Sequence, residues 1–160
     1  MKLGRYNKIK FNDIANVNGV SVSVFLQGCD FHCDGCFNKE TWDWGGGIPF
    51  TPDTLVEIEK GLTAHGIKRN LCILGGEPLH SKNFETTKFI VSSVKKDIPD
   101  IKIFIWTGFK YNDLTEEIKA FLKEKVDVLV DGQFEKENYK YGLKMRGSTN
   151  QKIIDLKNKI

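Results

Sequence analysis

The sequence predicts an α/β protein: a small, open or partial α/β barrel of mostly parallel strands, with an added N-terminal strand. Short apolar runs alternate along the chain with longer stretches whose apolar side chains recur at helical spacing. This order of strand, helix and strand implies right-handed β-α-β units and therefore a parallel sheet. The chain has four such strands, which are too few for a closed eight-stranded barrel.

Each expected strand is short and bounded by turn-forming residues. Residues Val20–Leu26 alternate between apolar and polar and are rich in β-branched side chains, as half-buried strands are. Leu71–Leu74 is continuously apolar, which is typical of a strand buried on both faces. The expected strands are residues 5–11 at an edge of the sheet, 20–26, 71–74, 101–106 and 126–130.

Three helices are expected between these strands, each with a start signal. Thr51 can cap the first helix, Pro52 can occupy its first turn, and Gly66 ends it. Asn83 and Asn112 are the expected caps of the second and third helices. We expect loops at residues 38–50, 134–141 and 146–150, and a short final element at 153–160.

Composition indicates one ordinary globular domain, residues 1–160. A net charge of +3 is too small to imply a nucleic-acid partner or a membrane surface, and no apolar run approaches the roughly 20 residues that span a bilayer. The N-terminus lacks the apolar region of a secretory signal, so we expect a cytoplasmic protein. There, four cysteines are expected to serve as metal or redox ligands rather than as a disulfide framework.

Three cysteines lie close together in a C-x3-C-x2-C pattern: Cys29, Cys33 and Cys36. Three thiolates are one fewer than a closed four-ligand site needs, and a [4Fe-4S] cluster held this way leaves one iron open to a small molecule. A zinc ion with His32 as fourth ligand is the alternative, but His32 is adjacent to Cys33, which makes tetrahedral chelation awkward. Cys72 lies in an expected buried strand and is predicted to be a packed small hydrophobe.

Unusual residues follow every expected strand of the parallel sheet. The cysteine loop follows the first, Gly75-Gly76-Glu77-Pro78 the second, Thr107-Gly108 the third and Asp131-Gly132 the fourth. The carboxyl ends of parallel strands share one edge of the sheet, where ligands bind, so we expect these residues to meet there.

The glycine-rich turn has a physical interpretation of its own. Two glycines let the backbone approach a ligand closely, and strand-end carbonyls with the Glu77 carboxylate suit an ammonium group. The alternative is a tight strand-to-helix turn with a solvated Glu77.

Taken together, the cysteine pattern after the first core strand and the turn Gly75–Pro78 resemble the radical S-adenosylmethionine (SAM) superfamily. Within it, the pattern of Gly28–Asn38 and the motif Arg146–Gln151 are similar to the activating proteins of anaerobic (class III) ribonucleotide reductases. The resemblance covers about residues 5–155 and implies a radical-SAM-type partial barrel.

This resemblance implies an oxidoreductase with two cofactors, one [4Fe-4S] cluster and SAM. The reduced cluster cleaves SAM to methionine and a 5′-deoxyadenosyl radical, which removes a hydrogen atom from a glycine Cα of the large reductase subunit. The implied partners are that subunit and an external one-electron donor such as a flavodoxin, in a homodimer or a heterotetramer with the reductase. No side chain is expected to act as a general acid or base.

The resemblance also implies site residues. The cluster ligands are Cys29, Cys33 and Cys36. The SAM contacts are Gly35, Phe37, Gly75, Gly76, Glu77, Pro78 and Thr107. One departure concerns Gly35, where many glycyl-radical activases carry an aromatic residue that packs on the adenine; Phe37 takes that role here, or no residue does.

Several residues keep two interpretations. Thr107 contacts SAM or only ends a strand, and His80 is expected to be structural. Trp42 and Trp44 are core anchors or a partner surface. Arg146, Ser148 and Asn150 contact the SAM carboxylate or the partner, or form a C-terminal turn.

Three other functions stay open. The chain could act on another glycyl-radical enzyme, or on a small molecule as 7-carboxy-7-deazaguanine synthases do. A zinc-binding adaptor is the non-enzymatic alternative.

Overall fold

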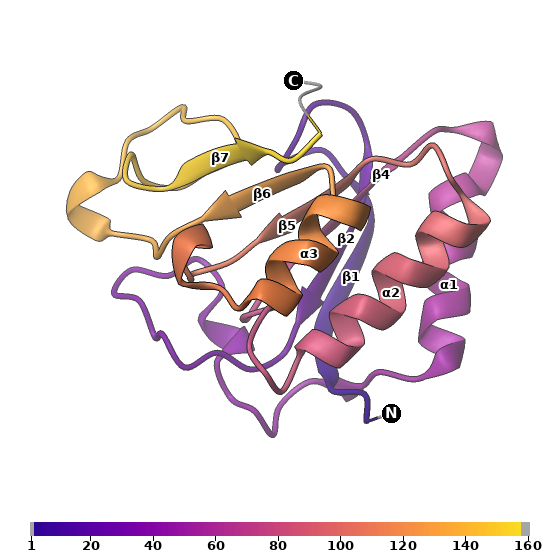
Figure 1. The fold of residues 1–160 in the computed structure, drawn as a ribbon, viewed down its shortest axis with the longest axis horizontal. Coiled ribbons are helices and arrows are strands. Elements are labelled where there is room, and N and C mark those ends of the chain that lie inside the picture. The colour runs from indigo at the N-terminus through magenta and orange to yellow at the C-terminus, as the bar shows by residue number, and fades with distance from the viewer. Residues whose placement is uncertain (1, 158–160) are drawn as a thin grey trace.

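The computed structural model describes residues 2–157 and shows a mixed α/β fold (Figure 1). Its sheet has seven strands in the order β3-β1-β2-β4-β5-β6-β7. The strands are β1 (Arg5–Asp13), β2 (Ser21–Leu26), β3 (Ile48–Pro49), β4 (Asn70–Gly75), β5 (Ile103–Trp106), β6 (Val128–Asp131) and β7 (Lys152–Asp155). The helices are α1 (Pro52–Thr63), α2 (Phe84–Asp97) and α3 (Glu116–Lys125), with short 3-10 turns at Lys39–Thr41, Ala64–Gly66, Tyr111–Asp113 and Lys136–Asn138.

Four central strands are parallel, as predicted. β2 pairs with β4, β4 with β5 and β5 with β6, all in parallel, while β1 and β7 flank this core in antiparallel pairing. The added N-terminal strand is thus confirmed, but its edge position is wrong. β3 pairs outside β1, with Tyr6 opposite Ile48, so the expected loop at 38–50 contains the edge strand. A two-residue strand has no periodicity by which a sequence could reveal it.

The helix caps were predicted in part. Thr51 caps α1, since its hydroxyl accepts from the Thr54 N–H. Asn112 was the wrong cap for α3, because Thr115 accepts from the Ile118 N–H instead. Asn83 precedes α2, but its side-chain amide donates to the carbonyls of residues 27 and 77 rather than capping the helix.

Alternate residues of each strand point to opposite faces of the sheet. In β4, Leu71 and Ile73 belong to the large core that packs against α1, α2 and α3, whereas Cys72 and Leu74 belong to a smaller cluster on the other face. The three helices therefore cover one face only (Figure 1). The face opposite the helices is where the strand ends and loops gather around a cavity.

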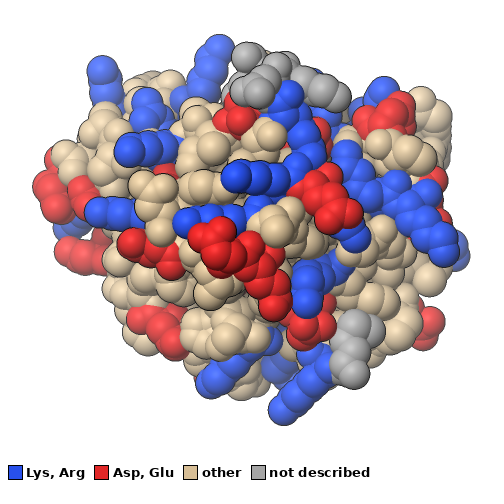
Figure 2. All heavy atoms as spheres, viewed as in Figure 1, with Lys and Arg blue, Asp and Glu red and all other residues tan. Residues whose placement is uncertain are grey.

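Charges of both signs are intermixed over the molecular face in Figure 2, which has no large patch of one sign. Within residues 2–157, no helix is long and apolar enough to cross a membrane. The final element expected at 153–160 is β7, which begins at Lys152; residues 158–160 lie outside the described part of the chain.

Candidate functional site

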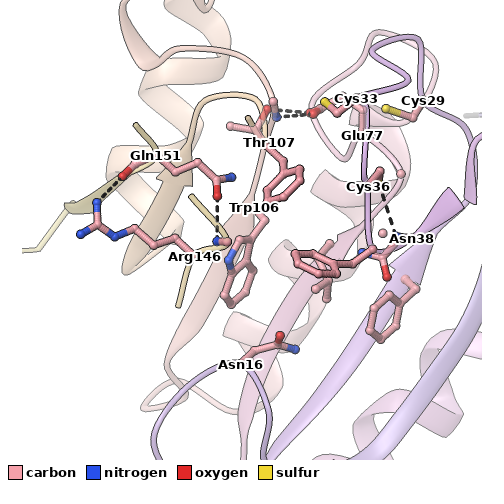
Figure 3. Close-up of a pocket in the computed structure, with 18 of the residues that line it drawn as sticks. Asn16, Cys29, Cys33, Cys36, Asn38, Glu77, Trp106, Thr107, Arg146 and Gln151 are labelled. Atoms are coloured by element: carbon pink, nitrogen blue, oxygen red, sulfur yellow. Dashed lines mark hydrogen bonds between the residues drawn. The ribbon is translucent and has the colours of Figure 1, made fainter. Parts of the chain in front are cut away.

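A cavity of about 490 Å³ lies on the sheet face opposite the helices, at the carboxyl ends of the parallel strands. The predicted site residues that line it are Cys29, Cys33, Cys36, Phe37, Gly75, Gly76, Glu77, Thr107 and Arg146. Figure 3 shows the three cysteines and Glu77 together on one side, Arg146 and Gln151 opposite, and Asn16 at the far end. The predicted residues that do not line it are Gly35, Pro78, Trp42, Trp44, Ser148 and Asn150.

Each of the three thiols accepts a hydrogen bond from at least one backbone N–H group. Burial raises the pKa of Cys29, while the N–H groups of Phe31 and His32 act in the opposite direction. Burial likewise raises the pKa of Cys33, against which the Phe134 N–H acts. The Asn38 N–H donates to Cys36 Sγ at 3.4 Å. Such N–H donors stabilise thiolates and are found around the sulfurs of iron–sulfur clusters.

The position of His32 bears on the alternative of a zinc ion with His32 as fourth ligand. Within residues 2–157, no three His, Cys, Asp or Glu side chains are grouped closely enough to hold one metal ion. His32 stacks its ring on Trp42, with ring centres 4.5 Å apart and planes 11° apart. Cys72 is fully buried on the sheet and lines no part of the cavity, as its strand position predicted. The His32 ring is therefore stacked on Trp42 rather than grouped with the three thiols as a fourth zinc ligand.

The Glu77 carboxylate is buried and already has protein partners. It accepts from the Thr107 hydroxyl at 2.7 Å, the Gly108 N–H at 2.6 Å and the Leu79 N–H at 2.9 Å. Burial raises its pKa to about 7, although these donors favour the charged form. The solvated Glu77 of the alternative interpretation is thus wrong, and the carboxylate braces the end of β4 against the end of β5.

Gly75 and Gly76 are needed because two strand ends come very close. A Cβ on Gly75, whose φ is +116°, would lie 2.6 Å from the Leu26 backbone, and one on Gly76 would lie 2.5 Å from the Gly28 carbonyl oxygen. The close approach is therefore between this turn and the end of β2, which carries the cysteine loop. The two motifs of the sequence are fixed to each other through backbone atoms.

Gly35 lies beneath an aromatic ring from a distant segment. Its φ is +76°, and a Cβ there would lie 3.3 Å from the Phe134 ring. Phe37 packs against the same ring with centres 5.1 Å apart. The ring over Gly35, the residue before the third cysteine, thus comes from Phe134, about a hundred residues later in the sequence.

Trp44 braces the start of the cysteine loop. Its Nε1–H donates to Asp30 at 2.8 Å, and its ring fills the space where a Cβ on Gly28 would lie. The second Asp30 oxygen lies 2.7 Å from His80 Nε2. His80 Nδ1 accepts from the Lys82 N–H, which leaves the proton on Nε2 and makes Asp30 its acceptor. Trp44 and His80 therefore both hold the cysteine loop through Asp30.

The motif Arg146–Gln151 folds into a turn held by its own groups. The Arg146 guanidinium donates to the carbonyls of Thr149 and Gln151, and Gln151 Oε1 accepts from the N–H groups of Gly147 and Ser148. Asn150 donates to the Gln133 carbonyl. Its Oδ1 atom is buried and has no hydrogen-bond partner among residues 2–157. Arg146, Gly147 and Gln151 of this motif line one wall of the cavity.

The comparisons with known proteins agree with this geometry. A family model described as a 4Fe-4S single cluster domain matches residues 15–154. Curated proteins named anaerobic ribonucleoside-triphosphate reductase-activating protein align with nearly the whole chain. That of Haemophilus influenzae is 38% identical over 142 residues, 88% of this chain and 91% of that protein. That of Vibrio cholerae is 37% identical over 142 residues, with coverage of 88% and 91%. That of Escherichia coli is 34% identical over 146 residues, with coverage of 91% and 94%.

The chain belongs to this family of activating proteins. These relatives are named as activators of an anaerobic ribonucleotide reductase, and the matching domain model describes one 4Fe-4S cluster. The sequence-based assignment to a family of iron–sulfur activating enzymes is confirmed.

Sequence reasoning missed several residues of this activating-protein site. Phe134 and Gln133 were expected only as part of a loop or not at all, yet both line the cavity, and Gln133 Oε1 lies 3.8 Å from Cys33 Sγ. At the far end, Lys8 and Lys10 place their ammonium groups 4.9 and 5.5 Å from the Phe25 ring centre. The one available signal was their alternation on β1, which puts both lysines on the same face.

Proposed function

We propose that this chain activates an anaerobic ribonucleoside-triphosphate reductase by forming a glycyl radical on its large subunit, using SAM and a [4Fe-4S] cluster. The observation that carries the proposal is the group of three thiols, Cys29, Cys33 and Cys36, which face one cavity beside a glycine turn and are called the cysteine wall below. They lie in a chain of the activating-protein family. Membership of that family makes the protein an enzyme of the activating type.

Cys29, Cys33 and Cys36 are the proposed cluster ligands, with backbone N–H groups from both sides of the cavity as donors to their sulfurs. A [4Fe-4S] cluster held by these three thiols would supply the single electron for reductive cleavage of SAM to methionine and a 5′-deoxyadenosyl radical. The chain itself binds the cluster and SAM, orients SAM and excludes water from the site. No titratable side chain is needed to move a proton.

SAM is proposed to bind between the cysteine wall and the ends of β4 and β5. Backbone atoms of Gly75 and Gly76 are proposed to contact SAM, and the rings of Phe37 and Phe134 are proposed to pack against its adenine. Thr107 donates a hydrogen bond to Glu77, so we propose that the two residues hold the strand ends around SAM. Three donors already meet the Glu77 carboxylate, which leaves it at most one free lone pair for SAM. The sheet, with helices on one face and this cavity on the other, is proposed to be an open radical-SAM-type barrel within a single domain.

The remaining parts of the reaction lie outside the chain. The proposed protein substrate is the large reductase subunit, whose target glycine has no side chain to block approach to the cavity. An external one-electron donor such as a flavodoxin is proposed to reduce the cluster in the cytoplasm. We also propose that the chain assembles as a homodimer or as a heterotetramer with the reductase.

Anaerobic reconstitution with iron and sulfide tests the chemistry. We expect a brown protein that, once reduced with dithionite, converts SAM to 5′-deoxyadenosine and methionine. Absence of both the chromophore and 5′-deoxyadenosine contradicts the proposal, and stoichiometric zinc without iron or sulfide identifies the adaptor instead. A protein that cleaves SAM but leaves the reductase unactivated belongs with the activases of other glycyl-radical enzymes or with small-molecule enzymes such as 7-carboxy-7-deazaguanine synthases.

A further inference from the structure

An exposed group of aromatic side chains stands beside the cysteine wall. Phe37, Phe134 and Tyr139 form a triangle of rings whose centres lie 5.1, 6.2 and 6.4 Å apart. Tyr141 follows two residues after Tyr139. These four residues are called the aromatic collar below. Three of them are exposed: Phe37 by 66%, Tyr139 by 51% and Tyr141 by 91%.

Close backbone packing supports the collar from below. A Cβ on Gly147 would lie 2.9 Å from the Phe134 ring and 3.0 Å from the Phe37 ring, and Gly35 lies directly under Phe134. Gly35 in the cysteine loop and Gly147 in the turn Arg146–Gln151 thus leave room for these rings. The Phe134 ring packs against both glycines, and the Phe37 ring packs against Gly147.

The segment that carries the collar is tied down on its other side. The Glu135 N–H donates to the Ser148 hydroxyl, and Tyr139 pairs with Ser148 in an isolated antiparallel bridge. The Thr149 N–H donates to the Asn138 carbonyl. The turn Arg146–Gln151 therefore holds the collar in place, which gives Ser148 a role the sequence did not show.

The collar is continuous with the cavity. Phe37 and Phe134 line it together with the three cysteines, and Tyr139, outside the lining, packs its ring against both of them. Tyr141, two residues further along the chain, is exposed by 91%. Exposed aromatic surface at the mouth of a site is costly in water unless a partner covers it. Tyrosine is also among the residues that dominate the binding energy of protein interfaces.

We propose that the aromatic collar docks the segment of the large reductase subunit that carries the target glycine. This inference rests on the proposed function, which requires that segment to reach the cysteine wall. The fitting partner is an extended peptide whose central residue lacks a side chain and whose neighbours place apolar groups on Tyr139 and Tyr141. SAM is a poorer occupant of the outer collar, because neither tyrosine lines the cavity.

The test uses the full-length reconstituted protein and the large reductase subunit of the same organism. The variants are Tyr141→Ala and the double change Tyr139→Ala with Tyr141→Ala. The matched control is Ile67→Ala, an exposed apolar residue that precedes β4 at the opposite end of the sheet. Three quantities are measured: affinity for the subunit by calorimetry, glycyl-radical yield by EPR, and SAM cleavage without the subunit.

We expect the double variant to bind the subunit about tenfold more weakly, because tyrosine is enriched among the few interface residues whose truncation weakens binding this much. The subunit concentration for half-maximal radical formation rises equally, while SAM cleavage without the subunit and all values for Ile67→Ala stay within about twofold of wild type. Tyr141→Ala, at a side chain exposed by 91%, separates docking from misfolding.

Three results overturn the inference. Wild-type affinity in the double variant shows that the collar is not the docking surface. An equal loss of SAM cleavage places the tyrosines in the SAM site, and a changed oligomeric state of the protein alone makes the collar a contact between copies. If the wild-type protein itself neither binds the subunit nor forms the radical, the proposed function fails, which is distinguishable from each of these.

Discussion

The two faces of the sheet are made from alternate residues of the same strands, yet they do different work. Toward the helices, Leu71, Ile73 and Ile105 are fully buried in one continuous core. On the opposite face, Leu74 and Trp106 border the cavity that the cysteines line. The strand residues that face the helices therefore stabilise the fold, while those on the opposite face, together with the strand ends, position the site.

The largest effect is expected at the cysteine wall. Replacing any one of Cys29, Cys33 or Cys36 by Ala should abolish SAM cleavage, a loss of at least about a thousandfold, since two thiolates cannot hold the cluster in place. Iron and sulfide content and 5′-deoxyadenosine formation are the measurements.

The matched control for this loss is Cys72→Ala on the sheet itself. Cys72 is buried away from the cavity, so this variant should keep its cluster and most of its activity. Loss of the cluster in Cys72→Ala alone would refute the ligand assignment.

The same contrast should be visible in thiol reactivity. Burial raises the pKa of Cys72 to about 12, and its side chain is fully buried, so it offers almost no thiolate to a reagent at pH 8. In cluster-free folded protein, iodoacetamide should modify the three cavity cysteines and leave Cys72 unmodified at least about a hundredfold longer. Mass spectrometry of peptides measures this, and modification of Cys72 as fast as Cys36 would show that the sheet is not closed there.

Stability should depend mainly on the helix-covered face. Ile73→Ala should lower the free energy of unfolding by about 3 kcal/mol, because it leaves a cavity in a fully packed core. Leu74→Ala, the next residue on the opposite face, should cost less, about 1 to 2 kcal/mol, since its side chain borders a cavity that already exists. Urea unfolding under anaerobic conditions compares the two; equal losses would break the distinction between the faces.

The smallest effect is expected at the loop anchor. Trp44→Phe keeps a ring against Gly28 but removes the N–H that binds Asp30. We expect a roughly threefold faster loss of the cluster to a chelator, followed by absorbance, because one hydrogen bond contributes modestly. Trp42→Phe, which leaves a ring to stack on His32, is the control and should lose its cluster at the wild-type rate.

The features predicted correctly from the sequence are those that depend on residues close together in the chain. The cap at Thr51, the parallel strands and the cysteine loop depend on neighbours in sequence, and all were found from local patterns. Asn112 failed because Thr115, three residues on, offers an equally good cap and the structure uses that one. β3 is too short to carry a pattern and exists because Ile48 reaches β1.

The parts of the site that were missed depend on contacts between distant segments. Phe134 over Gly35, Asp30 between Trp44 and His80, and Thr107 on Glu77 join segments far apart in sequence. No periodicity or motif spacing encodes such pairs. Gly35 was noticed as a departure from a pattern, and the Phe134 ring that packs over it could be found only from the fold.

The central claim is that the cysteine wall generates a radical on a partner's glycine. The most direct measurement incubates the reduced, reconstituted protein with SAM and the large reductase subunit without oxygen, then records the EPR spectrum. We predict a glycyl-radical doublet that requires SAM and is absent with Cys33→Ala. SAM cleavage without any radical on the reductase, while another glycyl-radical enzyme acquires one, would contradict the account.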